Sequence, residues 1–216
     1  MISRNLVLLA LLLAALPAAA QMSRAHRSEL YIGPVFTDGK NYSFNGGSSA
    51  RTDTGYGLNI GYAYNMDAHL QFGGDLVWGD QDYRATVRPG DGSAARNING
   101  TLETGTVRFF GTYHLSAKRF TPFVTGGLGW TYVDTNIPSG LPENVCWYYP
   151  WYGGYCSTYV PTASTTKFSY NAGLGLRLDQ GSGVFRFLVN SQWLDLGSGY
   201  SSANVIQYRI DIGTKF

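Results

Sequence analysis

The sequence predicts an all-β fold, an eight-stranded antiparallel up-and-down transmembrane β-barrel. Three observations predict it. Apolar residues alternate with small or polar residues at a period of two, this alternation recurs in eight segments, and the links between the segments differ regularly in length. An even strand number with short turns at one end and longer loops at the other is typical of barrels closed within a membrane.

The alternation is clearest over Thr54–Asn65, where large apolar side chains such as Tyr56 and Leu58 alternate with glycine, alanine and asparagine. A face without apolar bulk cannot pack against a soluble core, so we expect the apolar face to point outward and the small polar face inward. The other predicted strands are Glu29–Phe36, His69–Trp78, Glu103–Leu115, Phe123–Val133, Lys167–Leu178, Val184–Trp193 and Ile206–Phe216.

The links between these segments predict which end of the barrel faces outward. Short links fall at 65–68, 116–120 and 179–183, long links at 37–53, 79–102 and 134–166, and a link of middling length at 195–204. Short periplasmic turns and longer extracellular loops are the rule in such barrels. We therefore expect both chain ends of the barrel on the periplasmic side.

The first residues predict an export signal that is not part of the folded barrel. Arg4 supplies a positive charge, 6–16 is an apolar run too short to span a bilayer well, and Ala18–Ala20 supplies small residues for cleavage. We expect a signal peptide at 1–20 and one barrel domain at 21–216. An uncleaved anchor helix is the alternative.

The composition of the 216 residues is unusual for a soluble enzyme. Charged residues make up only 14%, against roughly 25% in soluble domains, while aromatic residues reach 15% and glycine occurs 28 times. A mean hydropathy of −0.13 argues against a bundle of membrane-spanning helices. The net charge of +2 gives no electrostatic footprint for nucleic acid.

The charges of the predicted strands lie on the small-residue face, where a soluble barrel or sandwich would place apolar side chains. They are Asp75, Arg108, Arg177, Arg186, Arg209, Asp211 and Lys215. Counting from the short turns puts Asp75 and Arg108 at one level of adjacent strands, so we predict a lumenal ion pair between them. Glu29 and Lys215, near the ends of the first and last strands, are a second predicted pair. Such charges could hold the barrel together or line a narrow polar pathway.

Two segments carry a resemblance to a known family. Pro122–Trp130 looks like the Pro-aromatic-x-x-Gly-x-Gly strand of small outer-membrane barrels. The terminal Phe216, with Tyr208, Ile210 and Ile212 on the same face, is similar to the signal read by barrel-assembly machinery. The chain therefore resembles the OmpX/OmpA-transmembrane-domain class, often called porin-family. That resemblance implies residence in the cell outer membrane, with membrane lipid, lipopolysaccharide and the assembly machinery as partners.

The third long link is not explained by membrane residence. Its two cysteines, Cys146 and Cys156, should form a disulfide in an oxidising compartment. Between them lie six aromatic residues: Trp147, Tyr148, Tyr149, Trp151, Tyr152 and Tyr155. This cluster either packs on itself or on lipopolysaccharide at the barrel rim, or binds an extracellular ligand.

The sequence offers little support for catalysis. His114-Leu115-Ser116 resembles the His-x-Ser pairing of lipid A deacylases, but the predicted topology puts it at a periplasmic turn, away from the outer leaflet. We expect no cofactor and no metal. The leading interpretation is a Gram-negative outer-membrane barrel with a structural or surface-interaction role and no catalysis. The alternatives are a narrow porin-like channel for small solutes and, less favoured, a lipid A-modifying enzyme.

Overall fold

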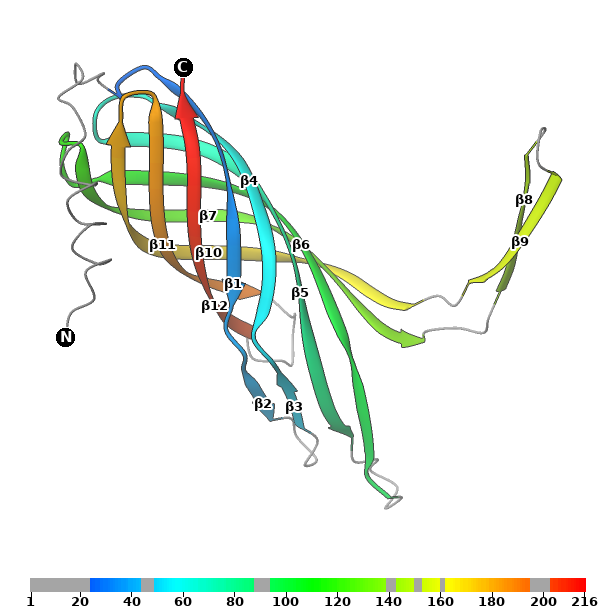
Figure 1. Ribbon diagram of the computed structural model, residues 1–216. Helices are drawn as coiled ribbons and strands as arrows, with labels where there is room; N and C mark the ends of the chain where they lie inside the picture. Colours follow the sequence, from blue (N-terminus) through cyan, green and yellow to red (C-terminus); the bar gives the residue numbers. More distant parts are fainter. Residues whose placement is uncertain are drawn as a thin grey trace, which may run out of the picture.

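The computed structural model describes residues 24–43, 49–87, 94–138, 143–149, 153–159, 162–194 and 203–216. Eight strands, each paired antiparallel with two neighbours, close into a barrel, which confirms the predicted fold class (Figure 1). They are β1 (Ser28–Thr37), β4 (Gly55–Asn65), β5 (Leu70–Val87), β6 (Arg96–His114), β7 (Phe120–Pro138), β10 (Thr162–Gln180), β11 (Gly183–Leu194) and β12 (Ala203–Lys215). Pairing of β1 with β12 closes the ring, with Glu29 opposite Lys215.

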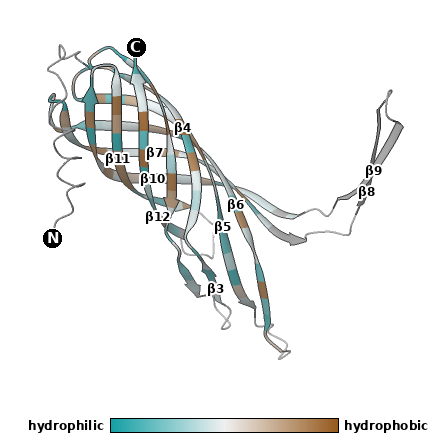
Figure 2. Cartoon of the chain, viewed as in Figure 1, coloured by the Kyte–Doolittle hydropathy of each residue, from teal (hydrophilic) through white to brown (hydrophobic). Residues whose placement is uncertain are grey.

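The two faces of the barrel wall differ as the alternation predicts. In β4, Tyr56 is 64% exposed on the outer face, whereas Asn59 is fully buried inside. The hydropathy colouring shows apolar bands along the strands of the barrel (Figure 2). Because every strand of the ring has both neighbours, the backbone polar groups of the wall are satisfied within the barrel, as a lipid-facing wall requires.

The short turns, the start of β1 and the end of β12 lie together at one end of the barrel. Ser28 and Phe216 exchange two backbone hydrogen bonds there, of 3.0 Å each. In the turn between β4 and β5, the backbone N–H groups of His69 and Leu70 donate to Asp67, and these bonds lower the pKa of its carboxyl group. The turn between β10 and β11 contains Gly181 with φ of 57°, a left-handed conformation that glycine adopts without strain. The predicted signal peptide, 1–20, lies outside the described residues.

At the opposite end, several strands run much further than the sequence indicated. The link 79–102 was expected to be a loop, but β5 continues to Val87 and β6 begins at Arg96, paired residue by residue. A short hairpin of β2 (Asn41–Ser43) and β3 (Ser49–Thr52) pairs with this part of β5. The outward-facing residues of β5 are here Asp80, Asp82 and Arg84, and 96–102 of β6 is exposed or half-buried on both faces. The apolar outward face that reveals a membrane strand is therefore absent from this stretch.

The third long link contains a hairpin of its own. Strands β8 (Glu143–Tyr149) and β9 (Gly153–Tyr159) pair with each other in a separate two-stranded sheet. Within the described part of the chain, no helix has the length and apolar character needed to cross a membrane.

Candidate functional site

Charged side chains fill the middle of the barrel. Asp75 on β5 lies opposite Arg108 on β6, and one edge of the guanidinium donates to both oxygens of the carboxylate. Nη2 of Arg108 lies 2.7 Å from Oδ2 of Asp75, and Nε lies 2.9 Å from Oδ1. Arg108 is only 3% exposed, so this two-point pairing forms where neither partner has much contact with water. The structure thus brings together the first pair expected from the sequence.

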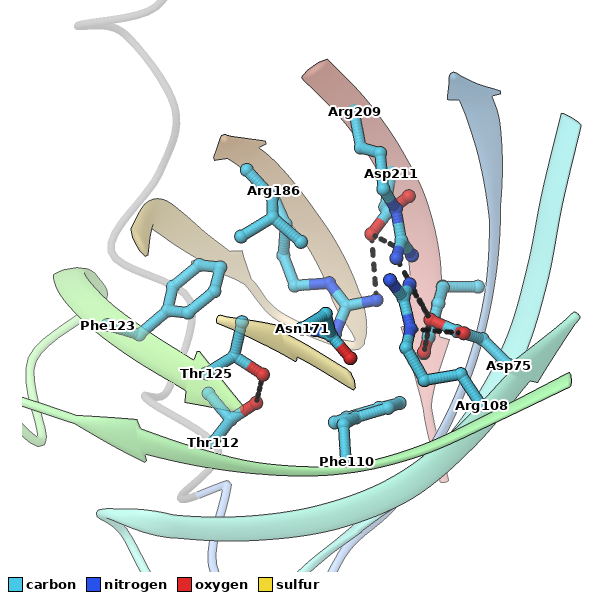
Figure 3. A pocket seen from close by; sticks show the side chains of 12 residues that line it. Asp75, Arg108, Phe110, Thr112, Phe123, Thr125, Asn171, Arg186, Arg209 and Asp211 are labelled. Carbon is cyan, nitrogen blue, oxygen red and sulfur yellow. Dashed lines mark hydrogen bonds and ion pairs between the residues drawn. The ribbon is translucent and has the colours of Figure 1, made fainter. Parts of the chain in front are cut away.

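A second carboxylate extends this pair into a network, shown in Figure 3. Arg209 on β12 donates to Asp75 at 2.9 Å and to Asp211 at 3.3 Å. Arg186 on β11 donates to Asp211 at 3.0 Å, and its guanidinium carbon lies 3.6 Å from the ring centre of Tyr31. We call Asp75, Arg108, Arg186, Arg209 and Asp211 the central network. Its charges sum to +1 when all five groups are ionised.

The central network leaves almost no free space across the lumen. The cavity that remains among these side chains and their neighbours Phe110, Phe123 and Leu188 measures about 20 Å³. One water molecule needs roughly 10–15 Å³ of such space. The described side chains therefore close the interior at this level to anything larger than about one water molecule.

A separate group of charges closes the short-turn end. Arg177 on β10 pairs with Glu29 on β1, and it also donates to Asp179 at 2.9 Å. Lys215 donates to Asp179 at 3.1 Å, and Arg24, just before β1, lies 3.5 Å from the same carboxylate. We call these five residues the lower network.

The lower network departs from the second pair expected from the sequence. Glu29 and Lys215 are register partners on adjacent strands, yet their charged groups bind Arg177 and Asp179. Glu29 binds Arg177 because the long side chain of Arg177 extends from β10 to β1 and donates to Glu29 through two nitrogens. The Lys215 ammonium offers only a point charge.

The His114–Ser116 pair is not assembled as a catalytic pair. His114 is fully buried with its ring against Phe123, and neither of its ring nitrogens has a hydrogen-bond partner among the described residues. Oγ of Ser116 accepts a bond from the backbone N–H of Lys118 instead. In the described part of the chain, no three His, Cys, Asp or Glu side chains are grouped in a way that could hold a metal ion.

At the long-loop end of the interior, the described side chains leave an open cavity whose lining residues carry no charge. A cavity of about 250 Å³ lies above the central network, with walls from Leu102, Val133, Leu194 and Val205. Tyr42 and several threonine and glutamine side chains complete its lining, among them Thr106, Thr131, Gln192 and Gln207. We call this cavity the outer cup.

The predicted third-loop residues lie only partly within the described chain. The register of β8 and β9 places Cys146 opposite Cys156 and Trp147 opposite Tyr155. Directly opposed residues of antiparallel strands have Cα atoms about 4.5–5.5 Å apart, a range that a disulfide can span. Tyr148 and Tyr149 also lie in β8, while Trp151 and Tyr152 lie outside the described residues.

The predicted assembly residues share the outer face of the last strand. Tyr208, Ile210, Ile212 and Phe216 are each at least 40% exposed along β12 and its end. They are available to lipid or to another protein, as a recognition signal requires.

Sequence reasoning missed several members of the interior. Arg24 belongs to no alternating segment, so nothing in the pattern marked it as a buried residue. Asn59 donates to Asp211 at 2.8 Å, and Gln71 donates to Glu29 at 2.8 Å. Their inward positions followed from the alternation, but their partners on distant strands did not.

The chain is similar in sequence pattern and in fold to known outer-membrane barrels. A protein-family model described as "Outer membrane protein beta-barrel domain" matches residues 6–213. No curated protein matches.

Among solved structures, the chain is similar to OprG from Pseudomonas aeruginosa, with 14% identity, a TM-score of 0.52 and coverage of 89% of this chain and 96% of that one. It is similar to Neisserial surface protein A at 12% identity, with a TM-score of 0.53 and coverage of 87% and 97%. Ail, the attachment invasion locus protein of Yersinia pestis, was solved in complex with the heparin analogue sucrose octasulfate. It shows 14% identity, a TM-score of 0.50 and coverage of 89% and 99%. At such identities the likeness supports the fold alone.

Proposed function

The chain belongs to the outer membrane protein beta-barrel domain family, and from that premise we propose that it is a closed barrel serving surface interaction rather than solute passage. Its place is the cell outer membrane, and its strands cross that membrane. The barrel would act as a rigid base that holds extracellular hairpins away from the lipid for contact with a partner. We propose no catalytic role.

The observation that carries this proposal is the filled interior. The lower network and the central network lie one above the other, and about 20 Å³ of space remains at the central level. Buried charges paired in this way are costly to separate, because each unpaired partner would lie in a medium with little water. The interior therefore favours a structural role.

A narrow channel for small solutes is the second candidate function. One observation favours a channel: among the buried charged residues that the structure describes, six are basic and only four are acidic, an excess that could attract anions. Passage would require the guanidinium groups of the central network to move out of their pairs. Single-channel recording distinguishes this candidate from a closed barrel.

The contact surface we propose is the third loop with its aromatic residues. Among the described residues, the exposed charges of the other extracellular strands are of both signs. They include Lys40, Arg51, Arg84 and Arg96 beside Asp38, Asp80 and Asp82. Ail binds a heparin analogue in its solved complex. The mixed charges here favour a partner recognised by aromatic contact over a highly sulfated one.

Binding of whole cells to a host-cell layer tests this proposal. Bacteria that display the chain should adhere, and Trp147→Ala combined with Trp151→Ala should reduce adhesion several-fold at unchanged surface level. Thr158→Ala, in the same loop but not aromatic, is the matched control and should leave adhesion intact. Equal adhesion by the tryptophan variant and the control would overturn the role of the loop.

Lipid A analysis tests the absence of catalysis. Mass spectra of lipid A from cells with and without the chain should be identical. A change in acylation that depends on His114 or Ser116 would contradict the proposal and favour the enzyme.

A further inference from the structure

We propose that the outer cup is a binding site for a small, uncharged, mostly apolar molecule that carries one hydrogen-bonding group. The cup belongs to the barrel interior and not to the third loop. It would therefore exist whether or not the loop binds a partner.

The walls of the cup are apolar where an aqueous vestibule would be polar. Leu102 of β6, Val133 of β7, Leu194 of β11 and Val205 of β12 all line it from the inside of the barrel. On β6, β11 and β12 these positions continue outward the inward-facing rows that carry arginine deeper in the lumen. On β7, Val133 continues the uncharged row that contains Thr131. Because no lipid touches this face, apolar side chains here expose their surface only to the cup.

The size of the cup sets the size of its ligand. A volume of about 250 Å³ exceeds the roughly 150 Å³ of an engineered cavity that holds benzene, and it is smaller than most sites for drug-sized ligands. A substituted aromatic ring or a short aliphatic chain fits this space.

The floor of the cup contains a polar group without a partner. Gln207 of β12 is 8% exposed, and its buried Oε1 accepts no hydrogen bond from any described residue. The neighbouring floor groups are already paired. Nε2 of Gln192 donates to Thr131 at 2.8 Å, and Thr131 shares a hydrogen bond of 3.0 Å with Thr106. An unpaired buried acceptor is costly. Rotation of the Gln207 amide toward the cup would let a ligand hydroxyl or N–H group donate to Oε1 and remove that cost.

Charge argues against an ionic ligand. The residues that line the cup are threonine, glutamine, tyrosine and aliphatic residues, and none of them is charged. The carboxylates and guanidiniums lie below, in the central network, where each is engaged by a partner. The same network closes the bottom of the cup, so a ligand that enters from the long-loop side would be retained rather than conducted.

Methyl NMR of the barrel in lipid nanodiscs, titrated with benzyl alcohol, tests this inference. Leu102, Val133, Leu194 and Val205 should show saturable shifts. The lipid-facing Leu128 and Leu174 report partition into lipid and should show only a linear drift. Val133→Trp combined with Val205→Trp puts two indole rings into the cup and should abolish the saturable shifts of Leu102 and Leu194. Ile206→Trp adds the same ring on the opposite face of β12 and should preserve them.

A second variant tests the floor without filling the cup. Gln207→Leu keeps the volume but removes the acceptor, so it should weaken benzyl alcohol about tenfold relative to toluene, which lacks the hydroxyl. Two results would overturn the proposal. One is a wild-type titration in which cup and lipid-facing methyl groups drift alike. The other is saturable binding that survives the double exchange Val133→Trp and Val205→Trp in a variant whose spectrum shows an intact barrel.

Discussion

Removal of the Asp75 carboxylate should destabilise the barrel far more than removal of a similar exposed carboxylate. Asp75 accepts from Arg108 at 2.7 and 2.9 Å and from Arg209 at 2.9 Å. With Asp75→Ala, the central network keeps three guanidiniums but only Asp211 to balance them. Arg108 then has no acidic partner within ion-pair distance among the described residues. Breaking a buried pair by removing one partner costs about 3–5 kcal/mol.

Urea titration in lipid vesicles, followed by tryptophan fluorescence, measures this loss as a fall in the free energy of unfolding. Asp80→Ala is the matched control, because Asp80 lies on the same strand and is exposed. We expect the control to change the free energy of unfolding by less than about 0.5 kcal/mol. If Asp75→Ala changes it as little as Asp80→Ala, the central network does not stabilise the barrel, and the reasoning from burial fails.

Three further predictions address the wall, its lipid face and the third loop. Gly213→Ala should lower the free energy of unfolding by about 1–3 kcal/mol in the same titration, because a Cβ there would lie 2.6 Å from the Leu30 carbonyl oxygen and 2.8 Å from Cβ of Tyr31. Gly126→Ala, whose nearest contact is 3.7 Å away, should be close to neutral, and equal losses would contradict this steric argument. Ile210→Arg should cost about 2–4 kcal/mol because it places a charge at mid-strand on the lipid face, and Ile206→Arg, nearer the strand end, should cost less. Maleimide labelling should detect no thiol at Cys146 or Cys156 in exported protein until a reductant is added, and labelling without reductant would refute the disulfide.

The faces and register of the barrel could be predicted because each strand must present apolar side chains to lipid and keep its charges inside. Ile210 faces outward and Asp211 inward for the same reason, and one residue of slip would put every charge into lipid. The shared level of Asp75 and Arg108 followed from counting up each strand from its own short turn, 65–68 below Asp75 and 116–120 below Arg108.

The partners of long side chains could not be predicted in the same way. Counting placed Glu29 beside Lys215, and the backbone agrees, but Arg177 reaches Glu29 from a strand that is not its neighbour. The interior of an eight-stranded barrel is narrow enough for an arginine side chain to cross it. Neighbouring positions in the wall therefore do not decide which charged groups bind each other. The lengths of β5 and β6 were also missed, since their outer parts have no apolar outward face to mark them as strands.

Single-channel recording in planar bilayers is the most direct test of a closed interior. The wild-type barrel, inserted at high salt, should show no stable conductance steps, because the central network leaves about 20 Å³ of space. Stable wild-type steps whose size or ion selectivity changes in Arg108→Ala would show that ions pass through the network. That result would contradict the closed barrel and establish the narrow channel in its place.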